Sequence, residues 1–263
     1  MESWLNLREN ELGKKGGKKH LKRKPAPRFW PIHRKELVWT AKPKPGPHSI
    51  AHCIPLMLII RDILGLAETR KEANTIISQE QITVDGKIQQ EKGFPIGLMD
   101  VISIPTIEKA YRVLPSEKGL ILHSIDAEEA KFKLCRIESK SLVKGGHVQL
   151  NLHDGRNVLV QRNDPKTPEE DNYRTLDVLR ISIPDQEIVE HANVAEGVPA
   201  IVFGGKNIGR HGNIVAFEKK PGQRRRNLLA TIEDKDGNRF QTTIDLVFAV
   251  GDKKPWISLP EVH

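Results

Sequence analysis

The side chains best suited to chemistry are cations that lie beside aromatic rings in the first 40 residues. No acidic residue occurs between Leu12 and Lys35, and three of the four tryptophans lie in or near this segment. Lysine and arginine neutralise phosphates, and an exposed ring stacks a base for ~1–3 kcal/mol. We expect this arm to bind a polyanion through Lys14, Lys15, Lys18, Lys19, His20, Lys22, Arg23, Lys24, Arg28 and Trp30. The alternatives are a solvated tail or an import signal, with the rings anchoring the arm to the body.

A second group of cations stands at a predicted helix start. Thr69 and Glu72 have the spacing of a capping box, and Arg70 and Lys71 lie between them. The free amides of a first helical turn and two adjacent cations suit a phosphate, although both side chains could instead be merely solvated. Lys87, in the hairpin that follows, completes the contacts expected in this region.

A glycine-rich stretch over residues 203–215 offers a third group. It lacks the Gly-Lys-Ser or Gly-Lys-Thr ending of a Walker loop, and a strand pattern follows it where a dinucleotide-binding loop would open a helix. We therefore expect a tight hairpin whose tip projects cations and polar groups, followed by a second basic loop. The expected contacts are Lys206, Asn207, Arg210 and His211, then Arg224, Arg225 and Arg226.

Catalytic and metal-binding constellations are not expected. His48, His52 and Cys53 lie within six residues but lack a second Cys or His pair at ligand spacing, so Cys53 is interpreted as a small buried hydrophobe. Glu128-Glu129 lies on a predicted helix over residues 126–131, where acidic pairs are usually solvated. We expect no catalytic residue, no metal, no cofactor and no small-molecule substrate.

The elements that position these groups are mostly strands. Pro55 suits the first position of a helix whose apolar residues recur from Leu56 to Leu64 and which Gly65 would end. A second helix is expected after Thr69. Asp85-Gly86 predicts a hairpin turn. Further strands are expected at residues 147–152, 157–160, 180–183, 200–203, 229–234, 239–243 and 246–250.

The charge distribution sets the arm apart from the rest of the 263 residues. Residues 1–50 hold 13 Lys+Arg and 4 Asp+Glu, a net of +9, whereas residues 51–263 hold 29 and 30, a net of −1. Glycines and prolines in the arm prevent a single helix, so we expect it to be extended until it meets a polyanion. No apolar run approaches the ~18–20 residues that cross a bilayer, and neither a secretory nor a transit signal is evident, so we expect a cytoplasmic protein without a membrane partner.

Several strings resemble known RNA-binding families. Leu64–Ala67, Thr69–Ala73 and Ile82–Lys87 resemble the small RNA-binding domain of bacterial ribosomal protein S-four, with Asp85 where that family usually has Asn, which puts a direct RNA contact there in doubt. The loop over residues 204–212 resembles the KOW motif, and Gly212 matches its characteristic glycine.

Taken in order, the strings resemble the small-subunit ribosomal protein family called S-four-e, found in archaea and eukaryotes. They are Lys18–Arg23, Ala26-Pro27, Gly46–His48, Met99–Ser103, Glu128–Lys131, Lys133–Cys135, the 204–212 loop and Lys254–Pro260. The first dozen residues lie outside the pattern, and the eukaryotic basic tail is absent, which favours an archaeal type. The resemblance implies a ribosome-bound structural protein whose partners are small-subunit ribosomal RNA and neighbouring ribosomal proteins.

The expected fold is α+β and mostly β, in four parts. These are a basic arm and Pro-rich linker (1–54), a helix–helix–hairpin RNA-binding domain (55–105), a central β-rich domain (106–195) and an SH3-like KOW barrel (196–263). The alternative functions are a subunit of an RNA-modifying enzyme and a KOW-type transcription elongation factor. The ribosomal RNA helices contacted and the role of residues 1–13 stay open.

Overall fold

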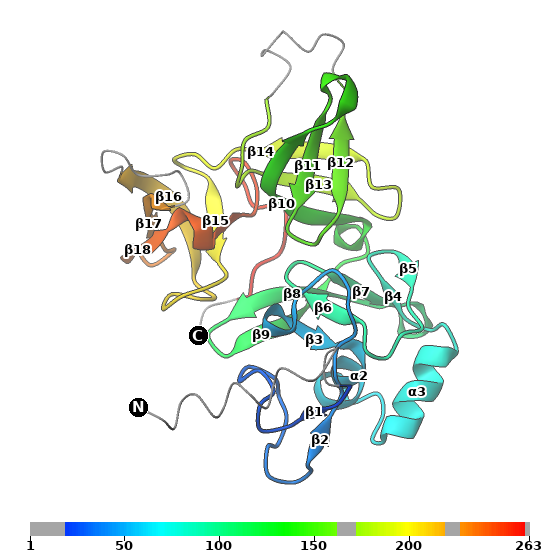
Figure 1. The fold of residues 1–263 in the computed structure, drawn as a ribbon. Helices are drawn as coiled ribbons and strands as arrows, with labels where there is room; N and C mark the ends of the chain where they lie inside the picture. Colours follow the sequence, from blue (N-terminus) through cyan, green and yellow to red (C-terminus); the bar gives the residue numbers. More distant parts are fainter. Residues whose placement is uncertain (1–18, 162–171, 219–226, 261–263) are drawn as a thin grey trace, which may run out of the picture.

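The computed structural model describes residues 19–161, 172–218 and 227–260. Within these ranges the protein is mostly β, with two short helices and several antiparallel sheets (Figure 1). No helix in the described ranges is long and apolar enough to cross a membrane. Six of the predicted contacts, Lys14, Lys15, Lys18, Arg224, Arg225 and Arg226, lie outside the described residues.

The first helix follows directly from a strand. Strand β3 (Cys53–Pro55) pairs with β6 (Pro95–Gly97), and α2 (Leu56–Leu58) runs on into a π-helical turn over Ile59–Ile63. The sequence predicted Pro55 as the first residue of the helix. In the structure Pro55 is the residue before the helix, because its backbone is still extended in β3. Gly65, at φ +63°, ends the helix as expected.

The second helix, α3 (Arg70–Ser78), begins with the predicted capping box. The Thr69 hydroxyl accepts a hydrogen bond from the Glu72 amide at 3.2 Å, and the Glu72 carboxylate accepts from the Thr69 amide at 3.4 Å. Ala73 and Ile77 form the buried face of α3, which packs in one apolar core with α2.

One sheet lies beside these helices and has the order β5-β4-β7-β8-β9. Asp85 and Gly86 both have positive φ, at 49° and 72°, and form the predicted hairpin turn between its first two strands. The last two strands lie past residue 105, and β8 pairs with β7 while β9 pairs with β8. The strands are β4 (Thr83–Val84), β5 (Lys87–Ile88), β7 (Val101–Ile104), β8 (Lys109–Ser116) and β9 (Gly119–Ile125).

A second sheet has the order β12-β11-β10-β13-β14 and contains the predicted hairpin near residue 155. Its strands are β10 (Phe132–Leu142), β11 (Val148–Leu152), β12 (Asn157–Val160), β13 (Val178–Ser182) and β14 (Ile188–Ala192). The predicted helix over residues 126–131 is wrong, because only a 3-10 turn over Glu129–Lys131 forms there. Six residues are too few to nucleate a helix unaided, and the buried Arg112 side chain binds both the carboxylate and the carbonyl of Glu129.

The third sheet has the order β18-β17-β16-β15-β19 and covers the largest apolar core of the described residues. Gly212 lies where β16 crosses β17 closely, since a Cβ atom there would stand 2.1 Å from the Glu233 carbonyl oxygen. The strands are β15 (Pro199–Val202), β16 (His211–Glu218), β17 (Leu229–Glu233), β18 (Arg239–Thr243) and β19 (Val247–Ala249).

The described part of the arm is folded, contrary to the extended segment that its composition predicted. Its strands β1 (Leu21–Lys22) and β2 (Trp39–Thr40) pair with each other. The loop between them is closed by the Arg34 guanidinium, which donates hydrogen bonds to four backbone carbonyls between residues 23 and 27. These internal hydrogen bonds order the described part of the arm, for which the composition predicted that a polyanion would be needed.

Candidate nucleic-acid interface

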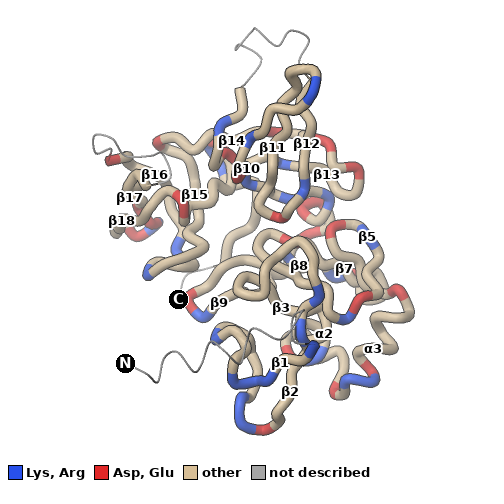
Figure 2. Tube along the Cα trace, in the orientation of Figure 1, with Lys and Arg blue, Asp and Glu red and all other residues tan. Residues whose placement is uncertain are grey.

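The arm presents most of its described cations to solvent. Lys19, His20, Lys22, Lys24 and Arg28 are all exposed, and Figure 2 shows Lys and Arg recurring on the loops around β1 and β2, whereas the two charge signs are mixed over the upper sheets. This is the charge placement that the sequence predicted. Such a surface can neutralise several phosphates at once.

Two of the predicted contacts in the arm instead face inward. The Arg23 side chain is buried and donates hydrogen bonds to the carbonyls of His33 at 2.6 Å and Trp39 at 3.2 Å. The Trp30 ring is 3% exposed, and its indole N–H donates to the Cys53 carbonyl at 2.7 Å. In this structure Trp30 offers no face to a base, so its role is the anchoring alternative.

Trp39 is the exposed ring of the arm. It is 55% exposed, with the Lys22 ammonium 5.8 Å and the His20 ring centroid 5.6 Å from its own ring centroid. The three side chains therefore form one aromatic and cationic surface. The predicted set omitted Trp39, although the sequence places it among the same charges as Trp30, because spacing alone did not show which ring is buried.

Replacing Trp39 with Ala is expected to weaken RNA binding by ~1–3 kcal/mol, the value of one stacked base. The free energy of unfolding should change by less than about 0.5 kcal/mol, because the ring packs little against the body. Leu37→Ala, at a 61% exposed position of the same loop, is the matched control. Equal RNA affinities of the two variants, measured by filter binding, would remove Trp39 from the interface.

At the start of α3, two exposed cations are available to an anion, while the capping box uses the Glu72 amide of the first turn. Arg70 and Lys71 are exposed. Hydrogen bonds from the Glu68 amide, the Thr69 side chain and the Thr69 amide lower the pKa of Glu72. Its carboxylate is therefore charged at neutral pH. This carboxylate accepts from the Glu68 and Thr69 amides, which precede the first turn of α3. The two cations lie beside it, with the exposed Lys87 farther along the same unit.

The glycine-rich loop divides its four predicted contacts into two pairs. Lys206 and Arg210 are exposed, and the Arg210 guanidinium lies 5.6 Å from the Phe240 ring centroid. The Asn207 amide donates to the Gln241 carbonyl at 3.1 Å, and His211 is 3% exposed, with a pKa lowered by burial. The latter two support the loop, and in this conformation the His211 ring has little surface to offer RNA.

Asp85, the acid that occupies the turn position, faces the interior. Its carboxylate contacts the Lys133 ammonium at 2.7 Å and the Arg156 guanidinium at 2.6 Å, and accepts from the Val101 amide at 3.0 Å. An inward carboxylate with two cations is not an RNA contact. This explains how an acid is tolerated beside a basic surface.

Lys133 is the centre of a buried charge cluster that the sequence did not indicate. Its ammonium also contacts Asp100 at 2.5 Å and Asp154 at 3.1 Å, and the Asp154 carboxylate contacts Arg156 at 3.2 Å. The cluster joins the sheet of β4 and β7 to the sheet of β10 and β11. It is a structural connection between two parts of the chain.

The cluster favours the charged forms of Lys133, Asp100 and Asp154, whereas burial raises the pKa of Asp85. Burial alone would raise the pKa of Asp100 and Asp154, but the Lys133 ammonium holds both below their ordinary values. Burial acts to lower the pKa of Lys133, but Asp100 and Asp85 hold it well above its usual range.

The group closest to a metal site in the described residues is Cys135, His153 and Asp154, whose ligand atoms lie within 4.8 Å of one another. It does not fit a cation. Both ring nitrogens of His153 already have partners, the Arg136 amide and the Leu98 carbonyl, each at 3.2 Å. Burial raises the pKa of the Cys135 thiol well above its ordinary value, and Asp154 faces Lys133, so the site already holds one positive charge.

The histidines near residue 50 do not converge with Cys53 on a metal either. His48 binds Asp100 at 3.1 Å. Burial, followed by the Asp100 charge, raises the pKa of the buried Cys53 thiol to about 12. Cys53 is thus a protonated core side chain, as the sequence predicted.

Comparison with known proteins gives three family matches along the chain. The RS4NT (NUC023) domain matches residues 15–51, the S4 domain matches residues 55–102, and the family described as Ribosomal family S4e matches residues 107–188. The chain therefore carries the N-terminal and RNA-binding domains of a ribosomal protein class.

Full-length relatives agree with these matches. The small ribosomal subunit protein eS4 of Staphylothermus marinus is 53% identical over 251 residues, 95% of this chain and 99% of the relative, and that of Desulfurococcus amylolyticus is 52% identical with the same coverage. The crystal structure of the 30S ribosomal protein S4e from Thermoplasma acidophilum has a TM-score of 0.62 at 32% identity, covering 76% of this chain and 96% of that one. The chain belongs to the ribosomal protein eS4 family. Since this is a family of non-enzymatic ribosomal proteins, the enzyme alternative is excluded.

Proposed function

We propose that this protein is a structural component of the small ribosomal subunit and binds small-subunit ribosomal RNA. The observation that carries the proposal is identity of about half over 95% of the chain with small-subunit proteins, including an S4 RNA-binding domain. The family membership implies a ribosome-bound protein in the cytoplasm, with ribosomal RNA and neighbouring ribosomal proteins as partners. An elongation factor would not share this identity along its whole length.

The contacts that we propose are the predicted ones that face solvent, with Trp39 added. Weak surfaces that are carried on one chain raise each other's effective concentration, so modest contacts can add to tight binding. Four of the predicted residues are proposed to support the interface through contacts within the protein. They are Arg23, Trp30, Asn207 and His211. The described members of the proposed set are Lys19, His20, Lys22, Lys24, Arg28, Trp39, Arg70, Lys71, Lys87, Lys206 and Arg210.

We further propose the four-part division at residues 54, 105 and 195, with β8 and β9 of the third part extending the sheet of the second part. The last part is proposed to be an SH3-like KOW barrel. Its support is a five-stranded antiparallel sheet in which the glycine-rich loop joins β15 to β16, and the close strand approach at Gly212, which only glycine permits.

The proposed function is tested at the start of α3. Arg70→Gln with Lys71→Gln should weaken binding to small-subunit RNA and lower the slope of log affinity against log salt by about 1–2, because up to two counterion-releasing contacts are lost. The control is Lys131→Gln with Lys144→Gln, which removes the same charge from exposed positions outside the proposed set. An equal loss in the control would show that only bulk charge matters.

A further inference from the structure

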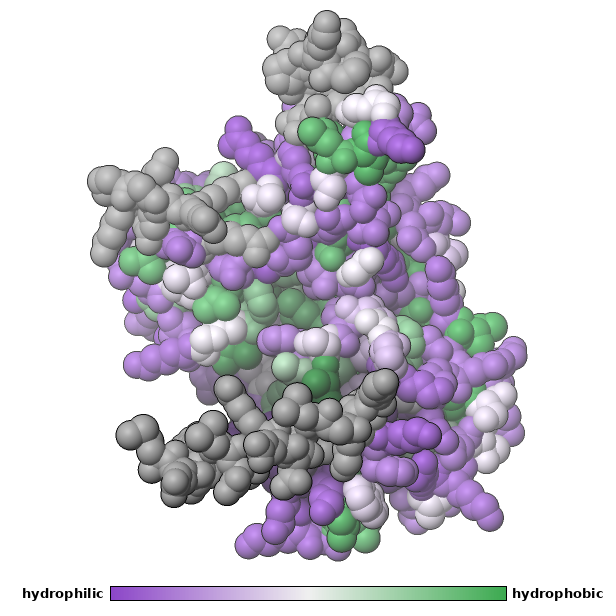
Figure 3. Space-filling model, in the orientation of Figure 1, coloured by the Kyte–Doolittle hydropathy of each residue, from purple (hydrophilic) through white to green (hydrophobic). Residues whose placement is uncertain are grey.

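A cavity of about 890 Å³ opens where all parts of the chain meet. Its lining comes from the arm, the 3-10 turn at residues 50–52, the β8–β9 turn, β10, the glycine-rich loop and β19. Figure 3 shows apolar residues gathered in the hollow between the upper and lower halves of the molecule. Its volume lies within the range of ligand sites, ~300–1,000 Å³.

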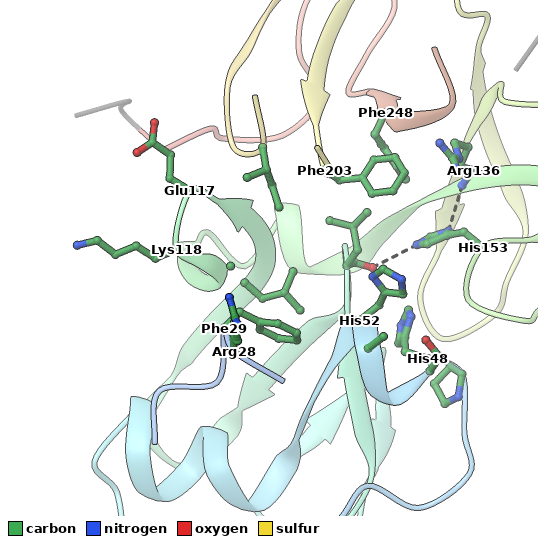
Figure 4. Close-up of a pocket in the computed structure, with 18 of the residues that line it drawn as sticks. Arg28, Phe29, His48, His52, Glu117, Lys118, Arg136, His153, Phe203 and Phe248 are labelled. Atoms are coloured by element: carbon green, nitrogen blue, oxygen red, sulfur yellow. Dashed lines mark hydrogen bonds between the residues drawn. The ribbon is translucent and has the colours of Figure 1, made fainter. Parts of the chain in front are cut away.

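The inner wall is aromatic and carries little net charge. Figure 4 shows Phe203 and Phe248 on one side of the cavity and Phe29 across from them. The Arg136 guanidinium, 4.7 Å from the Phe203 ring centroid, is neutralised by Glu138 and donates to the Asp245 carbonyl at 2.7 Å.

The histidine beside this wall is neutral at physiological pH. Burial, assisted by the Lys133 charge, lowers the pKa of His153 to about 4. The wall therefore suits a flat, uncharged ring better than a charged group.

The mouth, in contrast, is bordered by two cations, of which Arg28 belongs to the proposed interface. Arg28 and Lys118 are exposed at the outer edge, with Glu117 as one opposing charge (Figure 4). The glycine-rich loop that carries Lys206 and Arg210 closes the other side, because Gly209 packs against the backbone of the β8–β9 turn. A polyanion that follows the arm toward this loop must pass the mouth.

Polar groups that can read an edge of a ring also line the opening. The Ser49 hydroxyl and the His52 ring are exposed there, and neither side chain hydrogen-bonds to another described residue. Proteins recognise single-stranded RNA by stacking an extruded base on aromatic rings and bonding its edge, while cations hold the flanking phosphates. The cavity offers all three kinds of group in the required order from inside to outside.

We propose that this cavity receives one unstacked nucleobase of the bound RNA, with its phosphates on Arg28 and Lys118. The inference rests on the proposed function and adds a position where the protein selects RNA structure. Bulk phosphate contacts do not make that selection.

The test fills the cavity without disturbing the core. Ala51 is exposed on the 3-10 turn at the mouth, so Ala51→Trp places a ring in the opening. Ala127→Trp, at an exposed position outside the cavity, is the matched control. The probes are AMP, GMP, CMP and UMP, with ribose 5-phosphate as the ligand that lacks a base. Binding of each probe to the full chain is measured by saturation-transfer NMR.

Wild type and Ala127→Trp are expected to transfer saturation to base protons of at least one nucleotide, whereas Ala51→Trp should not, and ribose 5-phosphate should give no signal with any of them. Affinity for small-subunit RNA should fall on the order of tenfold in Ala51→Trp alone. Equal behaviour of the two tryptophan variants, with RNA binding intact, would overturn the cavity assignment and leave the proposed function standing. Normal RNA affinity combined with poor incorporation of Ala51→Trp into subunits would also overturn it, by assigning the cavity to a protein segment. If the wild-type protein does not bind small-subunit RNA, the proposed function itself is overturned.

Discussion

Replacing Lys133 with Met is expected to lower the free energy of unfolding by about 3–5 kcal/mol, because one buried cation is removed from three carboxylates. The Lys133 side chain is 1% exposed, and its ammonium contacts Asp85, Asp100 and Asp154 within 3.1 Å. The Met side chain has nearly the length of the Lys side chain. The loss of stability therefore comes from the unpaired carboxylates and only slightly from packing. Urea unfolding at pH 7 measures it. Lys131→Met, at an exposed position two residues away, should change stability by less than about 0.5 kcal/mol.

The pH dependence of this difference has a definite sign. In the wild type, Asp100 and Asp154 have lowered pKa values, so their contribution is present above an unfolded pKa of about 4 and is lost as the pH falls through the folded pKa. In Lys133→Met, burial without the cation raises the pKa values of the same two carboxyl groups. Acid protonates them and so removes the cost of burying an unpaired charge in the variant. The stability gap between wild type and variant should therefore narrow from pH 7 toward pH 3. A gap that is constant over this range would show that the cluster is not held by charge.

Four exposed cations of the arm are expected to supply a large share of RNA affinity. Replacing Lys19, Lys22, Lys24 and Arg28 with Gln removes four exposed cations of the proposed interface. At ~0.7–0.9 per contact, the slope of log affinity against log salt should fall by about 3. By the same relation the affinity should fall about a thousandfold at 0.1 M salt and hardly at all at 1 M. Filter binding to small-subunit RNA across this salt range measures both quantities.

The matched control separates charge placement from total charge. Gln at Lys109, Lys144, Lys235 and Lys253 lowers the net charge from +8 to +4, as the arm variant does, but at exposed positions outside the proposed interface. The control should lose far less slope than the arm variant. Equal slopes in the two quadruple variants would mean that the arm has no special role.

Local signals in the sequence predicted the elements that depend on neighbouring residues. The capping box at Thr69 and Glu72 and the turn at Asp85-Gly86 were identified because both act over a few residues. The helix expected over residues 126–131 failed for the opposite reason, since its outcome depends on Arg112, which is distant in sequence. Interactions between distant segments override weak local propensity.

The candidate interface shows the same limit. The sequence identified which cations cluster, but it did not show that Trp30 is buried and Trp39 exposed, because this is decided by the contact of Trp30 with Cys53, 23 residues away. It also placed Asp85 in a turn and put an RNA contact there in doubt, but it did not indicate the partner Lys133, which lies 48 residues farther along the chain. Composition indicated where the cations of the proposed interface cluster, and only the fold separated the side chains that face solvent from those that support them.

The most direct test of the central claim is sucrose-gradient fractionation of native extract, with this protein detected in every fraction. We predict that it sediments with the small ribosomal subunit and that moderate salt does not release it, because several separate surfaces bind at once. A pool that sediments free of the subunit, or together with RNA polymerase, would contradict the account.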